Sequence, residues 1–397
     1  MKYVVILGDG MADFPMEELN NKTPLMVANT PTFDLISKRS FVGVLKTVPD
    51  GMSAGSDVAN LSVLGYDPLK SYSGRSPLEA VNIGVNLTDT DVTYRANLVT
   101  LDGEGEYENL TLKDYSGGEI STADAKILID YLKNYIDNER FTLYSGVSYR
   151  HCLVKNSGGV CGGLTPPHDI SGKVVSKYLP SDDTLLEIMK KSHELLSSHP
   201  LNKKRISEGK NPANSLWLWG EGTKPSLENY QQKYGVKGGM ISAVDLLKGI
   251  AKLSGMQIIE VSGATGNYKT DFMAKARACV DALNGGLDFV YVHIEAADEC
   301  GHQGDVKNKI YSIEQIDKVS GYVIEELKKS GEDFKVLICP DHPTPISIKT
   351  HSKEPVPFMI YSSKEEFLGT LSFDENTAKD AQNFIESGEK LMKIFFN

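Results

Sequence analysis

Three short apolar runs that end in acidic or histidine residues constrain the fold of this chain most strongly. They are YVVILGDG, which ends at Asp9, GLDFVYVHIEAAD, which ends at Asp298, and DFKVLICPDH, which ends at Asp341 and His342. Runs rich in β-branched residues are typical of strands buried in a parallel sheet. The last two runs are separated by a helical pattern from Lys309 to Lys329. Strand, helix and strand, with polar groups at carboxyl ends, predict an α/β sheet with its site at that edge.

The chain is too long, at 397 residues, for one typical domain. From about residue 235 onwards the α/β pattern is continuous, with helices in ISAVDLLKGIAKLSGM and KTDFMAKARACVDALNGG and a strand in QIIEVSG. The middle instead shows mixed short strands in DVTYRANLVTL and FTLYSGVSYRHCLV, and one clear helix in TLLEIMKKSHELLSS. We therefore predict a discontinuous α/β domain, residues 1–87 and 232–397, and an inserted α+β domain, residues 88–231.

Composition narrows the class of protein. A hydrophobic content of 40% with 24% charged residues indicates a soluble globular chain. The net charge of −11 argues against a nucleic-acid partner bound through its phosphates. Five cysteines without a CxxC pair fit a reducing compartment. The N-terminal apolar run is too short for a signal peptide, and no window approaches a membrane span. We expect a cytoplasmic protein without a membrane partner; homo-oligomerisation is left open.

Carboxylate and imidazole side chains gather at the predicted strand ends. Asp298 and His302 are four residues apart and would face the same way on a helix. Taken singly, each such residue also fits ordinary loop or surface polarity. Taken together, they predict a two-metal site for Mn²⁺, Zn²⁺ or Mg²⁺. The candidate ligands are Asp9, Asp298, His302, Asp341, His342 and His351.

Ser56 is the candidate nucleophile. It lies in SAGSDVANLSVLG, where a helix is expected to begin after Gly55. A helix N-terminus binds phosphate, and a divalent cation makes a serine alkoxide accessible. The alternative is that Ser56 only caps the helix, with Ser53 and Ser62 equally available.

A phosphorylated small substrate also needs cationic partners. Arginine offers a planar fork to phosphate or carboxylate. Each candidate also has a plainer explanation, as a surface ion pair or a turn. No Walker motif is present, and no GxGxxG follows a strand. The candidates are Arg75, Arg95, Arg150, His151, Lys237 and the pair His168 and Asp169.

Several stretches resemble the archaeal-type, cofactor-independent phosphoglycerate mutases of the alkaline phosphatase superfamily. The matching stretches span essentially the whole chain. The resemblance implies an alkaline phosphatase-like α/β fold, with a mostly parallel sheet sandwiched by helices and a smaller inserted α+β domain. The stretches are VVILGDGMAD, PDGMSAGSDVANLSVLGYDP, YSGRSPLEA, YRANLVT, YRHCLV, GGMISAVDLLKGIA, EAADECGH, and CPDHPTP followed by THSKEPVPF.

The resemblance also implies a mechanism that needs two divalent metal ions and no 2,3-bisphosphoglycerate. Mn²⁺ is the first candidate for these ions, before Zn²⁺ and Mg²⁺. Ser56 would take the phosphoryl group from one phosphoglycerate and return it to the other hydroxyl of the enclosed glycerate. The inserted domain would act as a lid and supply substrate contacts. The implied ligands are Asp298, His302 and His351 for one ion, and Asp9, Ser56, Asp341 and His342 for the other.

Some points stay open at the level of sequence. The general acid is undecided among His151, Asp169 and Lys237. DHPTP followed by THS resembles a bacterial branch proposed to replace homoserine kinase in threonine synthesis, and its metal ligands are the same. The lack of an ATP motif favours the mutase. A phosphohydrolase of the superfamily would need open access for water, and a purely structural metal site would not need a serine.

Overall fold

The computed structural model describes all residues from 1 to 397, which form two compact units. Unit 1 comprises residues 1–72 and 226–397, and unit 2 comprises residues 73–225. The first boundary therefore lies earlier than the predicted one at residue 87. The reason is that helix α5 (Ser76–Asn82) packs on strands β3 (Val92–Asp102) and β7 (Ser215–Thr223) of unit 2.

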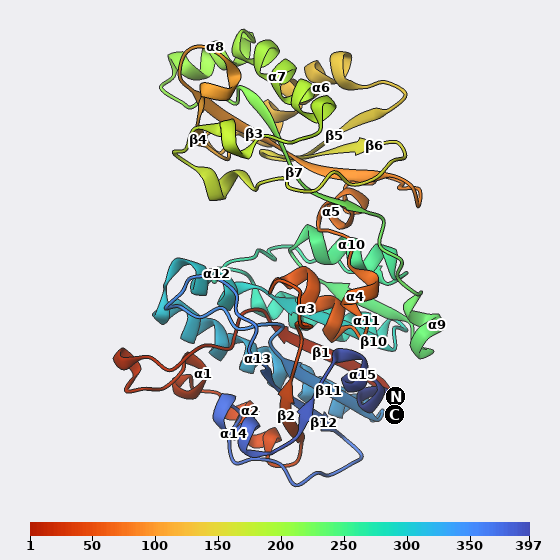
Figure 1. Cartoon of the computed structure of the whole chain (residues 1–397). Helices are drawn as coiled ribbons and strands as arrows, with labels where there is room; N and C mark the ends of the chain where they lie inside the picture. Colours follow the sequence, from red (N-terminus) through yellow and green to blue (C-terminus); the bar gives the residue numbers. More distant parts are fainter. The chain divides into compact units, whose positions relative to one another are not determined.

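Unit 1 is built on an eight-stranded, mostly parallel sheet (Figure 1). At its centre, β1 pairs in parallel with β10 on one side and with β11 on the other. Strand β12 runs antiparallel to both of its neighbours. The predicted α/β fold is therefore confirmed, although the strand expected in QIIEVSG shortens to two residues. The strand order is β13 (Phe384–Ile385), β2 (Phe41–Leu45), β12 (Val356–Ser362), β11 (Phe334–Cys339), β1 (Lys2–Gly8), β10 (Phe289–Ile294), β8 (Gly238–Ile241) and β9 (Gln257–Ile258).

Helices cover both faces of this sheet, which explains why its central strands are mostly apolar. Val4 and Ile6 of β1 share a core with Ile313 of the long helix α13, whereas Val5 and Leu7 point to the opposite face and are equally buried. No helix of the chain has both the length and the apolar character that crossing a membrane requires. The α-helices of unit 1 are α1 (Pro24–Val27), α2 (Pro31–Ser37), α3 (Ser56–Val63), α4 (Pro68–Ser71), α9 (Tyr230–Tyr234), α10 (Asp245–Leu253), α11 (Phe272–Asn284), α12 (Ala296–Gln303), α13 (Val306–Ser330), α14 (Glu375–Asp380) and α15 (Gly388–Phe396).

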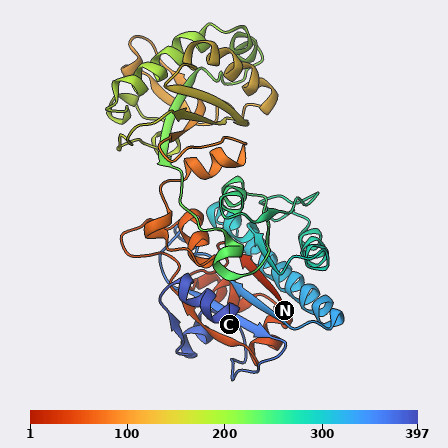
Figure 2. The same ribbon diagram turned by 90° about the vertical axis from the view of Figure 1, so that its right-hand side faces the viewer.

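Unit 2 is built on a five-stranded antiparallel sheet (Figure 2). Its strands follow the order β4–β3–β6–β5, and β7 also pairs with β3. The chain enters this unit at Ser73 and leaves it just after Thr223, and the Thr223 amide donates to the Ser73 carbonyl at 3.3 Å. Helix α6 was not predicted. The remaining elements are β4 (Thr111–Asp114), α6 (Thr122–Ile136), β5 (Phe141–Val147), β6 (Arg150–Lys155), α7 (Asp183–Ser197) and α8 (Pro200–Ser207).

A buried ion pair joins α13 to the loops at the carboxyl edge of the main sheet. Lys309 Nζ lies 2.6 Å from Asp13 Oδ2, and neither side chain is exposed to solvent. The same ammonium donates to the carbonyl oxygens of Thr344 at 2.8 Å and Ala12 at 3.3 Å. One lysine therefore ties together the loops that follow β1 and β11.

We expect Lys309→Ala to lower the free energy of unfolding by about 3–5 kcal/mol, because it leaves the Asp13 carboxylate buried without its partner. Lys329 is the matched control: it pairs with Glu326 on the same helix, but its side chain is 68% exposed. Lys329→Ala should cost less than about 1 kcal/mol. Urea unfolding of both variants tests this, and equal costs would contradict it.

Candidate functional site

The topology of unit 1 brings most of the predicted ligands to one edge of the sheet. Asp9 follows β1, Asp298 lies on α12 just after β10, and Asp341 and His342 follow β11. These three strands are neighbours and run parallel. Their carboxyl ends therefore meet, and the side chains that follow them converge.

Asp298, His302 and His351 form the first group. Asp298 and His302 lie one turn apart on α12, and His351 lies in the loop between β11 and β12. The Nε2 atoms of the two histidines are 3.0 Å apart. The Asp298 carboxylate reaches His302 Nε2 at 3.3 Å and His351 Nε2 at 3.4 Å. Two imidazole nitrogens and a carboxylate aimed at one point suit a borderline divalent cation.

Asp9, Ser56, Asp341 and His342 form the second group. His342 Nε2 lies 3.2 Å from Ser56 Oγ, 3.4 Å from Asp341 Oδ2 and 3.7 Å from Asp9 Oδ1. Ser56 is the first residue of α3, and Gly55 occupies the N-cap position. Ser56 therefore does not serve as the cap, and its hydroxyl faces the candidate ligands.

Burial and like charges make the second group unfavourable without a cation. Burial, together with the negative charges of Asp341 and Asp298, raises the pKa of Asp9 well above its ordinary value. Asp9 Oδ1 is buried and has no hydrogen-bond partner. A divalent ion would offset the repulsion and satisfy this oxygen. The residues present therefore fit a bound metal.

The first group differs, because its carboxylate is already paired with imidazoles. Burial opposes ionisation of Asp298, but hydrogen bonds from His302 and His351 hold its pKa well below the ordinary range. The hydrogen bond that His302 donates to the Asp298 carboxylate also raises the pKa of His302 to about 9. Without metal, His302 is therefore protonated at neutral pH.

Thr344 links the two groups and was not predicted. Its hydroxyl hydrogen-bonds to Asp298 Oδ1 of the first group and lies 3.2 Å from His342 Nδ1 of the second. A proton on His342 Nδ1 leaves Nε2 free to bind a cation. The only signal in the sequence is that Thr344 follows His342 by two residues.

Asn60 and Tyr291 were also missed. The Asn60 amide donates to Asp341 Oδ2 and to the Ser56 carbonyl oxygen, both at 2.8 Å. The Tyr291 hydroxyl donates to Asn60 Oδ1 at 2.6 Å. This network joins the helix of the candidate nucleophile to a candidate ligand. Asn60 lies one helical turn after Ser56, and that spacing could have indicated it.

His293 is the fourth site residue that was not predicted. It belongs to β10, is fully buried, and places Nε2 2.9 Å from Asp9 Oδ2. Burial lowers its pKa well below the ordinary value, so its ring is neutral. A polar residue inside the apolar run FVYVHI is a signal that could have found it.

Several of the predicted substrate residues gather within unit 2. Glu79 of α5 accepts from Arg75 Nε at 2.8 Å and lies 2.9 Å from Arg95 Nε. The Arg95 guanidinium carbon also lies over the Trp219 ring, 4.1 Å from the ring centre. The His168 ring packs edge-on against the same ring, with 5.4 Å between the two ring centres. The structure therefore brings Arg75, Arg95 and His168 into one cluster.

The remaining predicted residues of unit 2 have individual surroundings. His151 follows Arg150 on β6, is buried, and accepts a hydrogen bond at Nδ1 from the Gly146 amide at 3.0 Å. Burial and the charge of Arg150 lower the pKa of His151 to about 3. Asp169 lies 3.6 Å from His168, and both side chains are at least half exposed.

Lys237 is not brought to the ligands. It immediately precedes β8, which runs parallel to β10. Lys237 therefore lies at the amino edge of the sheet, whereas the candidate metal ligands lie at the carboxyl edge. Its selection depended only on its charge and on the neighbouring glycines.

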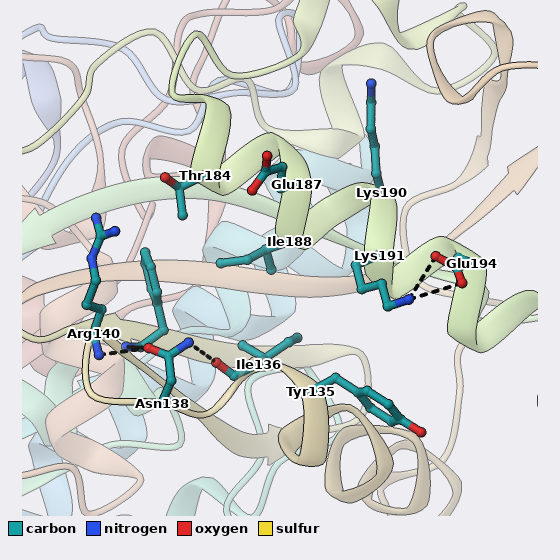
Figure 3. A pocket seen from close by; sticks show the side chains of 11 residues that line it. Tyr135, Ile136, Asn138, Arg140, Thr184, Glu187, Ile188, Lys190, Lys191 and Glu194 are labelled. Carbon is teal, nitrogen blue, oxygen red and sulfur yellow. Dashed lines mark hydrogen bonds and ion pairs between the residues drawn. The ribbon is translucent and has the colours of Figure 1, made fainter.

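A pocket of about 540 Å³ lies elsewhere on unit 2 (Figure 3). The positive charges of its two lysines are paired with glutamates: Lys191 lies 3.0 Å from Glu194, and Lys190 pairs with Glu108. None of the predicted substrate residues lines it. The lining residues are Tyr135, Ile136, Asn138, Arg140, Phe141, Thr184, Glu187, Ile188, Lys190, Lys191 and Glu194.

Known sequences of one family are similar to this chain over nearly its whole length. A family model described as 2,3-bisphosphoglycerate-independent phosphoglycerate mutase matches residues 37–202. The enzyme of that description from Methanosarcina barkeri is 48% identical, over 96% of this chain and 95% of the relative. The one from Methanosarcina mazei is 46% identical, over 99% of both chains.

Solved structures agree as well. A protein from Pyrococcus horikoshii superposes with a TM-score of 0.82 at 31% identity, covering 99% of this chain and 96% of that one. The cofactor-independent phosphoglycerate mutase of Thermoplasma acidophilum superposes with a TM-score of 0.68 at 26% identity, covering 100% and 99%. The chain therefore shares its fold with these proteins along its whole length.

Metal binding should release protons at neutral pH, because His302, whose pKa is raised to about 9, must become neutral before it can bind a cation. Affinity should therefore rise with pH, by up to about tenfold per pH unit, and level off near pH 9. Calorimetric titration of metal-free protein with MnCl₂, in buffers of different ionisation enthalpy, measures the protons released. Heats that do not depend on the buffer would contradict this expectation.

Proposed function

Because the chain belongs to the family of 2,3-bisphosphoglycerate-independent phosphoglycerate mutases, we propose that it interconverts 2- and 3-phosphoglycerate through a phosphoserine at Ser56. The observation that carries this proposal is the position of Ser56. Its hydroxyl starts a helix, lies 3.2 Å from His342 Nε2 and faces the second ligand group. A helix N-terminus favours the negative charge that a phosphoserine brings.

The proposal includes two divalent ions. Asp298, His302 and His351 would hold one, and the second group around Asp9 and Asp341 would hold the other. Mn²⁺ fits these oxygen and nitrogen donors, and Zn²⁺ and Mg²⁺ are compatible with them. When bound, the ions supply positive charge that favours the serine alkoxide and the phosphoryl oxygens.

The protein's own groups perform the transfer in two matched steps. Ser56 Oγ forms a bond to phosphorus while the bond from phosphorus to the substrate oxygen breaks, which leaves glycerate and phosphoserine. The other hydroxyl of glycerate then attacks the same phosphorus and frees Ser56. No external phosphoryl donor is consumed, because the group returns to the molecule from which it came.

Unit 2 is proposed to supply the cationic contacts to substrate. The cluster of Arg75 and Arg95, with Arg150 on β6, offers guanidinium groups suited to carboxylate and phosphate. His151 and Asp169 stay candidates for the general acid. Exclusion of water protects the phosphoserine from hydrolysis.

Ser56→Ala should abolish the conversion of 3-phosphoglycerate into 2-phosphoglycerate in the absence of 2,3-bisphosphoglycerate, with a loss of about a thousandfold or more, because the attacking oxygen is gone. Ser53→Ala is the matched control, since Ser53 is exposed in the preceding loop. It should retain activity. A Ser56→Ala enzyme with wild-type turnover would exclude the phosphoserine mechanism.

Substrate identity needs a separate assay, because homoserine kinase-like phosphotransfer could use the same ligands. We expect wild-type protein with homoserine and ATP to yield no O-phosphohomoserine, since the chain has no nucleotide motif. Free phosphate released from phosphoglycerate should form far more slowly than the isomer. If O-phosphohomoserine accumulated and phosphoglycerate were not isomerised, the site would instead belong to a homoserine phosphotransferase of amino-acid biosynthesis.

A further inference from the structure

His293 is a buried polar residue in the central sheet with partners for both ring nitrogens. It stands beside Leu7 in the register of β1 and β10, and its side chain is fully buried. Nδ1 lies 3.2 Å from Ser242 Oγ, and Nε2 lies 2.9 Å from Asp9 Oδ2. Lys275 Nζ holds the His293 carbonyl oxygen at 2.9 Å. Ring and backbone are therefore both held in place.

The carboxylate partner of Nε2 sets the direction of these hydrogen bonds, and the serine partner of Nδ1 is compatible with it. The Val244 amide donates to Ser242 Oγ at 3.0 Å, which leaves the serine hydroxyl hydrogen free to donate to His293 Nδ1. The ring proton then resides on Nε2, which donates to the Asp9 carboxylate. With a cation holding Asp9 in its ionised form, the other tautomer would turn a lone pair of Nε2 toward a carboxylate, which is repulsive.

We propose that Ser242 and His293 form a relay that positions the Asp9 carboxylate for the second ion, with His293 acting through Asp9 and not as a ligand. The inference rests on the proposed function, because it assumes an ion at Asp9. The relay engages Oδ2 only. Oδ1 is buried without a hydrogen-bond partner and is the oxygen nearer to His342 Nε2, at 3.7 Å.

Distance alone would allow a different role. The ligand atoms of Asp9, His293 and Asp341 all lie within 4.8 Å of one another. However, a bond from His293 Nε2 to a cation would move the ring proton to Nδ1 and break the hydrogen bond to Asp9. An imidazole that donates to a ligating carboxylate instead fixes the orientation of that ligand and tunes its basicity.

The test is a calorimetric titration of metal-free protein with MnCl₂. Wild type should bind two ions, and Asp298→Ala should identify the ion held by the first group. His293→Leu should lower the affinity for the other ion by about 10- to 100-fold and leave the affinity for the first ion unchanged. His293→Gln should retain most of the affinity, because its amide nitrogen can donate to Asp9 from a similar place.

Ser242→Ala is a milder variant that removes only the hydroxyl, in case His293→Leu does not fold. It should lower the affinity for the same ion, but by less than His293→Leu does. Affinity equal to wild type in Ser242→Ala, or in a folded His293→Leu protein, would overturn the relay. If His293→Gln lost as much affinity for this ion as His293→Leu, the relay would be overturned too, because His293 itself would then be a ligand of the ion. A wild-type protein that binds fewer than two ions would instead contradict the proposed function.

Discussion

Repulsion among three carboxylates is the constraint on which the rest of unit 1 depends. Asp9, Asp298 and Asp341 are all nearly or fully buried at the carboxyl edge of the sheet. Buried charges are costly unless they are paired or bind cations. Three parallel strands with apolar side chains on both faces hold them close in spite of that cost. The stability of the sheet thus maintains an arrangement of charge that the carboxylates alone would not adopt.

Residues outside the candidate ligand set hold the two groups in place. Thr344 contacts a ligand of each group, and Asn60 joins the start of α3 to Asp341. Lys309 ties the loops that carry Asp9 and His342 to helix α13. A change at Thr344 is therefore expected to affect both groups.

Periodicity and strand ends indicated the sheet and the gathering of ligands, because parallel strands place their carboxyl ends together whatever their order. Lys237 shows the limit of such reasoning, since its place at the amino edge depends on the direction of β8. His293, Asn60 and Thr344 acquire their roles from contacts between distant segments, which no local pattern contains. Helix α6 was not predicted, although its sequence carries a local signal, the N-cap residue Ser121.

Unit 2 holds the two ends of its own chain together, since Ser73 at its start and Thr223 near its end exchange hydrogen bonds. Closing a flexible loop costs entropy that grows with its length. Once unit 2 is folded, however, unit 1 has to close only the short segments that lead to and from this joint. A long insertion therefore has the entropic cost of a small loop. By the same physics, its sequence can change or lengthen in evolution without a penalty to the sheet of unit 1.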